Sequence, residues 1–161
     1  MADTLKTVVP HLPEEKPRHL LGIGRIKDIF IAVENGIDLF DCVIPTREAR
    51  HGRIWTNKGA YDIRKSIYHN NKSRLESICT CPACKKFTRG QIHEWFKTKN
   101  PLAGRYASIH NIWFFNSLLE KIRASIKAVP GSSFSSVTLG SSATALSATT
   151  SWCLCLRLEK T

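Results

Sequence analysis

The sequence predicts an α/β fold, and three neighbouring segments carry this prediction. Residues 19–21 form a short apolar run, and the apolar residues between 26 and 33 recur at helical spacing. Asn35-Gly36 is a suitable helix end, and residues 37–44 form a second apolar run. Strand, helix and strand in this order are the repeating unit of a parallel α/β sheet.

The other elements follow from the same kinds of pattern. We expect a short helix over about 3–9, strands at 53–56 and 61–63, and a helix that includes 91–95. After Pro45 the chain is polar and turn-rich, which is typical of loops. A final helix is expected over about 103–127, with one apolar face made of Ile109, Ile112, Leu119, Ile122 and Ile126.

The composition divides the chain into two parts. Residues 1–128 are expected to fold. Between Pro130 and Ser151, 12 of 22 residues are Ser or Thr, which is too polar for a core. We therefore expect residues 129–161 to be a disordered or aberrant tail.

The charge is strongly positive and unevenly spread. The chain has 24 Lys and Arg against 13 Asp and Glu, a formal charge of +11, and the segment from Arg47 to Arg105 alone carries +10. Such a density favours a polyanionic partner, nucleic acid above all, over a basic surface that merely keeps the protein in solution. No targeting segment and no apolar run of membrane-spanning length is seen, and Cys79 and Cys81 are spaced too closely for an easy disulfide. We expect a cytoplasmic protein without membrane contact.

Three cysteines in a Cys-x-Cys-x2-Cys arrangement, at Cys79, Cys81 and Cys84, predict a tetrahedral zinc site rather than ordinary thiols. Spacing does not choose the fourth ligand. A ligand on the final helix would tie this segment to the main core, which favours His110. The candidates are His93, His110, Cys42 and the two cysteines of the tail.

Two further signals lie around the second apolar run. Asp41 is a carboxylate near the end of an apolar strand, where parallel α/β folds place catalytic residues, although it could also serve a local hydrogen bond. The segment Thr46 to Arg50 offers two arginines three residues apart, which suits phosphates or base edges unless it is simply a solvated loop. Gly22-Ile23-Gly24 would let phosphate approach the backbone closely.

These signals stand in one order: LLGIG, IDLFDCVIPTREAR, CTCPAC and SIHN. In this order they closely resemble the C-terminal part of the tRNA-guanine transglycosylase family, over roughly residues 1–128. The resemblance implies an α/β fold that is the C-terminal part of a TIM (β/α)8 barrel, present only as a partial barrel. It also implies an inserted zinc-binding subdomain at about 51–110.

The resemblance also implies a reaction. The family replaces guanine at the wobble position of a tRNA with a GUN anticodon by a 7-deazaguanine base, prequeuosine-1 base or queuine, through a covalent Asp-ribosyl intermediate. Asp41 would be the nucleophile. One structural Zn²⁺ would be bound by Cys79, Cys81, Cys84 and His110, and the family commonly forms homo- or heterodimers. The RNA contacts would fall on Gly22, Ile23, Gly24, Arg25, Ile26, Lys27, Asp28, Thr46, Arg47, Glu48, Ala49 and Arg50.

The chain departs from the family in two ways. His19 and Leu21 stand where the family often has Tyr and Met, close to the expected base pocket. The family's general acid/base and most of its base-recognition residues lie in the other part of the barrel. We therefore expect the 161-residue chain alone not to catalyse base exchange. A non-catalytic zinc-containing RNA-binding module and a non-functional gene remnant are the alternatives.

Overall fold

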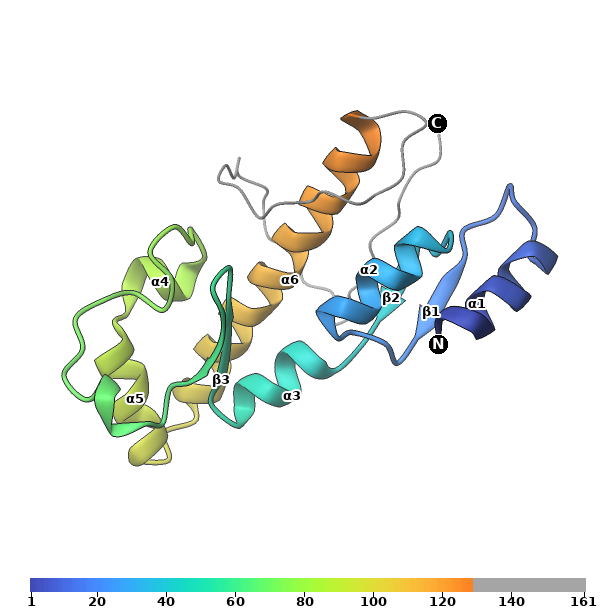
Figure 1. Cartoon of the computed structure of the whole chain (residues 1–161). Helices are drawn as coiled ribbons and strands as arrows, with labels where there is room; N and C mark the ends of the chain where they lie inside the picture. Colours follow the sequence, from blue (N-terminus) through green and yellow to red (C-terminus); the bar gives the residue numbers. More distant parts are fainter. Residues whose placement is uncertain (129–161) are drawn as a thin grey trace. The chain divides into compact units, whose positions relative to one another are not determined.

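The computed structural model describes residues 1–128, and in this part the chain forms two compact units, 1–44 together with 119–128, and 45–118 (Figure 1). This part of the chain contains both helices and strands. Its strands form one parallel and one antiparallel two-stranded sheet, and these described residues contain no closed barrel. The expected tail, 129–161, lies outside the described residues.

The first unit is built on the predicted strand–helix–strand arrangement. Strand β1 (His19–Leu21) pairs in parallel with β2 (Leu39–Asp41), and the register places Leu21 opposite Asp41. Helix α2 (Ile26–Glu34) connects them, and helix α1 (Ala2–Val8) precedes them with a 3-10 turn, η1 (Val9–His11). The parallel pairing confirms the predicted α/β class, because parallel strands need such a crossover.

Local hydrogen bonds explain why α2 ends and β2 begins where they do. Gly36 adopts a φ of +83°, which glycine reaches without strain, and its amide donates to the carbonyl of Val33. Asp38, 5 % exposed, then accepts a 2.8 Å hydrogen bond from the backbone amide of Arg18. This buried carboxylate joins the residue before β1 to the residue before β2 and so sets the parallel register.

The segment after β2 differs from the prediction. The strand expected over 37–44 is confined to Leu39–Asp41, and the residues expected to form a loop after Pro45 form helix α3 (Ile44–Arg50). Pro45 lies in the first turn of this helix, where a backbone amide is not needed for intrahelical bonding. The amide of Ile44 donates to the sulfur of Cys42 at 3.3 Å. A proline that suggested the end of a strand therefore marks the start of a helix.

The second unit contains the two other predicted strands, although the one expected at 61–63 spans 59–62. β3 (Arg53–Thr56) and β4 (Gly59–Asp62) form an antiparallel hairpin in which Arg53 lies opposite Asp62. After them come the 3-10 turn η2 (Ser66–Tyr68), α4 (Pro82–Lys86) and α5 (Arg89–Lys97). Helix α5 begins with a capping box, in which Thr88 and Gln91 satisfy each other's backbone amides.

The long final helix, α6 (Leu102–Ala128), contributes residues to both units. Its predicted extent is confirmed within a residue, but its buried face is not purely apolar, because His110 and Asn111 are fully buried on it. Ile126, expected on that face, is 41 % exposed. Within residues 1–128, no helix combines the length and apolar character required to cross a membrane.

The core of the second unit surrounds the three cysteines. Ile54, Ile63, Leu75 and Ile92 are fully buried in the same cluster as Cys79, Cys81 and Cys84. The hairpin, the cysteine segment and α5 therefore share one core with the sulfur atoms inside it.

Candidate metal centre and basic helix

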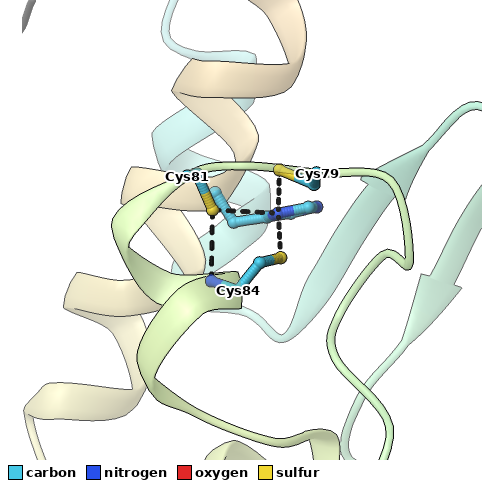
Figure 2. Close-up of side chains that lie close together, drawn as sticks. Cys79, Cys81 and Cys84 are labelled. Atoms are coloured by element: carbon cyan, nitrogen blue, oxygen red, sulfur yellow. Dashed lines mark hydrogen bonds between the residues drawn. The ribbon is translucent and has the colours of Figure 1, made fainter. Parts of the chain in front are cut away.

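Four potential metal ligands converge in the second unit. The sulfur atoms of Cys79, Cys81 and Cys84 and one ring nitrogen of His110 all lie within 4.8 Å of one another. Figure 2 shows the three labelled cysteines turned toward one another, where the loop that carries Cys79 meets the start of α4. All four side chains are buried, and the most exposed of them, Cys79, is only 8 % accessible.

The distances fit a tetrahedral zinc ion. His110 Nδ1 lies 3.3 Å from the sulfur of Cys84 and 3.6 Å from the sulfurs of Cys79 and Cys81. Ligand atoms about 2.0–2.3 Å from a tetrahedral zinc stand roughly 3.5 Å from each other. Three thiolates and one imidazole are a donor set that zinc prefers. The cluster is therefore compatible with one structural zinc ion.

Hydrogen bonds to the surrounding backbone orient two of these ligands. Cys81 caps helix α4, because its sulfur accepts the amide of Cys84 at 3.3 Å, and Pro82 follows in the first helical position. His110 Nε2 lies 2.9 Å from the carbonyl oxygen of Trp55. A carbonyl only accepts, so Nε2 carries a proton, and with a metal bound Nδ1 would offer its lone pair to that metal.

The electrostatics of the cluster favour a cation. Hydrogen bonds from Cys79 and Cys84 hold the pKa of the Cys81 thiol well below its ordinary value, while hydrogen bonds to Cys81 and Cys84 raise the pKa of the Cys79 thiol. Burial lowers the pKa of His110, but its hydrogen bonds to Cys81 and Cys84 outweigh burial and raise that pKa to about 10. Negative charge is therefore favoured at the Cys81 sulfur, beside a protonated His110 whose proton a metal ion would replace.

The other candidate fourth ligands are placed elsewhere or lie outside the described residues. His93 is fully buried, and its Nδ1 bonds to the carbonyl of Ile63 at 2.8 Å. Cys42 belongs to the first unit, where it packs against Gly24. The cysteines of the tail lie beyond residue 128. Among the described residues, His110 is the histidine that joins the three cysteines.

Asp41 is the last residue of β2 and is partly buried. Its carbonyl accepts a 2.8 Å hydrogen bond from the amide of Gly22, so the ends of the two parallel strands are joined directly. Gly22 has a φ of +74°, and the segment beyond it exposes the charged side chains of Arg25 and Lys27 before α2 begins its second turn. The carboxyl ends of parallel strands are the usual position of functional residues in α/β folds.

The expected RNA-contact segment Thr46–Arg50 is helical. Arg47 and Arg50, three residues apart in α3, are both exposed, while Ala49 is fully buried. Residues at this spacing lie on one side of a helix. The sequence offered the two arginines but not the helix that places them on a common face.

Sequence reasoning also missed residues beside Arg47. An open hollow in the second unit is lined by α3 and by the hairpin, with Arg53 and Arg64 close to Arg47. Arg53 pairs with Glu48 at 3.4 Å, and Arg64 pairs with Asp62 at 2.7 Å, which lowers the pKa of the Asp62 carboxyl. The antiparallel register, with Arg53 opposite Asp62, could have suggested this cluster. The complete lining is Arg47, Glu48, His51, Arg53, Asp62 and Arg64.

The charge follows the division into units. Residues 45–118 hold fourteen Lys and Arg against four Asp and Glu, a formal charge of +10. Residues 1–44 and 119–128 hold eight of each, so they are formally neutral. The unit that contains the cysteine cluster and α3 therefore carries almost all of the net charge that would attract a polyanion.

Comparisons with known proteins agree on one family. The sequence profile described as "Queuine tRNA-ribosyltransferase" (TGT) matches residues 1–136. Proteins of that name from Clostridium perfringens (strain 13 / Type A) and Clostridium kluyveri (strain NBRC 12016) are 43% and 44% identical to this chain over 126 residues, 78% of it. One from Clostridium botulinum (strain Langeland / NCTC 10281 / Type F) is 42% identical over 122 residues, 76% of the chain. The chain spans about a third of each relative's length, 33%, 34% and 32% respectively.

Proposed function

Because this chain belongs to the queuine tRNA-ribosyltransferase family, we propose that it carries the nucleophile, part of the RNA-contact surface and the structural zinc site of a tRNA-guanine transglycosylase. The observation that carries this proposal is the position of Asp41 at the carboxyl end of a parallel strand, joined through its carbonyl to Gly22, which directly follows the neighbouring strand. In this proposal β1 and β2 are the seventh and eighth strands of a TIM barrel, and residues of about 51–110 are its zinc insertion.

The reaction assigned to Asp41 is a double displacement. Its carboxylate attacks C1′ of the target guanosine ribose, and the bond from C1′ to guanine breaks with its electron pair on the base, which takes up a proton. The ribose is then covalently bound to Asp41. A 7-deazaguanine, having given up a proton, attacks C1′ from the opposite face and restores the carboxylate, so the RNA strand is never cut.

The other groups of the chain bind and orient. The exposed Arg25, Lys27, Arg47 and Arg50 suit the phosphates and base edges of an anticodon loop whose target nucleotide has left its stack. A zinc ion bound by Cys79, Cys81, Cys84 and His110 would fix the fold of the second unit and leave no open position for water.

A chimera tests the nucleophile. Residues 1–128 would replace the matching third of the Clostridium kluyveri relative, and labelled guanine exchange into tRNA would be measured together with a covalent RNA–protein adduct. We expect exchange and adduct in the chimera, and neither when it carries Asp41→Asn. Asp38→Asn is the matched control, because its amide oxygen can still accept the amide of Arg18. Retention of adduct by the Asp41→Asn chimera would contradict the assignment. The 161-residue chain alone should show no exchange, and turnover by it would refute that expectation.

The concentration of charge in residues 45–118 favours a second candidate, a non-catalytic zinc-containing RNA-binding module. In that case the chain should bind an RNA hairpin with strong salt dependence, Asp41→Asn should not alter the affinity, and the chimera should form no adduct.

A further inference from the structure

Trp55 is bonded both to the candidate zinc ligand and to the basic helix α3. Its carbonyl oxygen accepts the Nε2 proton of His110 at 2.9 Å, and its indole Nε1 donates to the carboxylate of Glu48 at 2.8 Å. Glu48 stands in α3 between Arg47 and Arg50. One residue of β3 therefore connects the metal centre to the middle of the helix that presents the two arginines.

Asn111 fixes the same region from the neighbouring position on α6. Its side-chain oxygen accepts the amide of Trp55 at 3.0 Å, and its side-chain nitrogen donates to the carbonyls of Pro45 at 3.0 Å and Arg53 at 2.9 Å. Asn111 is fully buried, so these three bonds have no competition from water. His110 and Asn111 together hold both backbone groups of Trp55 and the first turn of α3.

The indole is held in place on its other sides. It packs edge-on against Phe115, with ring centroids 5.6 Å apart, and is stacked with Phe114 at 6.5 Å. The guanidinium of Arg53 lies 5.4 Å from the centre of the Trp55 ring and 3.4 Å from the carboxylate of Glu48. A shift of the Trp55 backbone would therefore be transmitted to Glu48 rather than absorbed by free rotation of the ring.

We propose that Trp55 is a positioning residue that couples occupancy of the metal site to RNA binding by α3. A metal bound at Nδ1 of His110 fixes the direction of Nε2 and so the carbonyl of Trp55. The indole of Trp55 in turn fixes Glu48 and the face of α3 that carries Arg47 and Arg50. Coupling of this kind is reciprocal, so RNA bound to α3 must strengthen retention of the metal by the same factor. The inference rests on the proposed contact between α3 and RNA.

The test measures the zinc affinity of the full 161-residue chain by equilibrium competition with a chromophoric chelator, with and without an RNA hairpin that carries an anticodon loop. Binding of the hairpin is measured separately by anisotropy in the zinc-loaded chain. We expect saturating RNA to raise the zinc affinity about five-fold, the lower end of the usual range for coupled sites.

Trp55→Phe separates coupling from folding. Phenylalanine keeps the backbone bonds to His110 and Asn111 and much of the contact with Phe115, but it lacks the donor to Glu48. The variant should still bind one zinc ion, bind the hairpin about five-fold more weakly, and lose the protection of zinc by RNA. Trp113→Phe is the matched control, since Trp113 packs partly buried on the same core, and it should behave as the unsubstituted chain.

The outcomes distinguish this inference from the proposed function. If the hairpin does not bind the zinc-loaded chain, the RNA-binding function itself fails. If the hairpin binds but leaves the zinc affinity unchanged, RNA binding stands and the coupling is refuted. Protection that persists in Trp55→Phe would also overturn the role of the indole.

Discussion

Gly24 approaches Cys42 so closely that a β-carbon at Gly24 would lie 2.5 Å from the sulfur and 2.6 Å from the β-carbon of Cys42. No side chain larger than hydrogen fits there without movement of one segment. Gly24 lies three residues after the end of β1, and Cys42 directly follows the end of β2. The close approach therefore holds together the two segments that carry Gly22 and Asp41.

We expect Gly24→Ala to destabilise the chain by about 1–3 kcal/mol, because an added methyl group in a closed contact forces the backbone to shift. Urea unfolding would measure the loss. In a Cys42→Gly background the clash disappears, so the double variant should lose less stability than the sum of the single variants. Strict additivity would show that the contact is not the cause.

Asn111→Ala should cost about 3 kcal/mol of unfolding free energy with zinc in excess, because it leaves the buried backbone groups of Pro45, Arg53 and Trp55 without the bonds that Asn111 supplies. Asn116→Ala, at an exposed position of the same helix, is the control and should change stability by less than about 0.5 kcal/mol. Equal losses in the two variants would contradict the bonding role of Asn111.

Two matched histidine variants test which histidine is the fourth zinc ligand. The purified chain should contain one zinc ion per molecule. The variant His110→Asn should lose this ion, because an amide side chain does not replace the imidazole nitrogen as a zinc ligand. His93→Asn should keep its zinc, since the amide nitrogen can still donate to the carbonyl of Ile63. Metal content after gel filtration distinguishes the two, and the reverse pattern would disprove the ligand assignment.

Zinc affinity should rise with pH between about 7 and 9. Without metal, the thiolate hydrogen bonds raise the pKa of His110 to about 10 from 6.5, so its imidazole is protonated in this window and zinc must displace that proton. The folding stability of the metal-free chain depends on pH in the opposite direction. The stabilisation from charged His110 is complete below pH 6.5 and is lost as the pH rises through about 10.

Calorimetric titrations with zinc in buffers of different ionisation enthalpy would count the released protons. An affinity that stays constant across this pH window would contradict the protonated state of His110.

Arg47→Ala and Arg50→Ala should each weaken hairpin binding and reduce the slope of log affinity against log salt by about 0.7–1, the effect of one lost phosphate contact. Lys6→Ala removes the same charge from α1 in the neutral unit, and it should leave the slope unchanged. Equal effects of all three substitutions would mean that net charge alone, and not the surface of α3, governs binding.

Periodicity predicted the elements in which apolar residues recur regularly along the sequence. The pair β1 and β2, the helix between them and the extent of α6 follow directly from apolar spacing. It failed at Pro45, because a proline fits both a strand end and the first turn of a helix, and local sequence does not distinguish them. The role of Asp41 as nucleophile stays a prediction that the chimera would test.

The sequence by itself determined the chemistry of this protein: three closely spaced thiols, a strand-end carboxylate, a basic segment and the order of motifs that indicates the family. Only the tertiary structure decided which distant residues meet. His110, 26 residues beyond Cys84, reaches the cysteines from α6, and its neighbour Asn111 bonds to Trp55, 56 residues earlier in the chain. The reason is physical, since bonds between residues far apart in the chain depend on how elements pack, while residue type and spacing specify only what each element can offer.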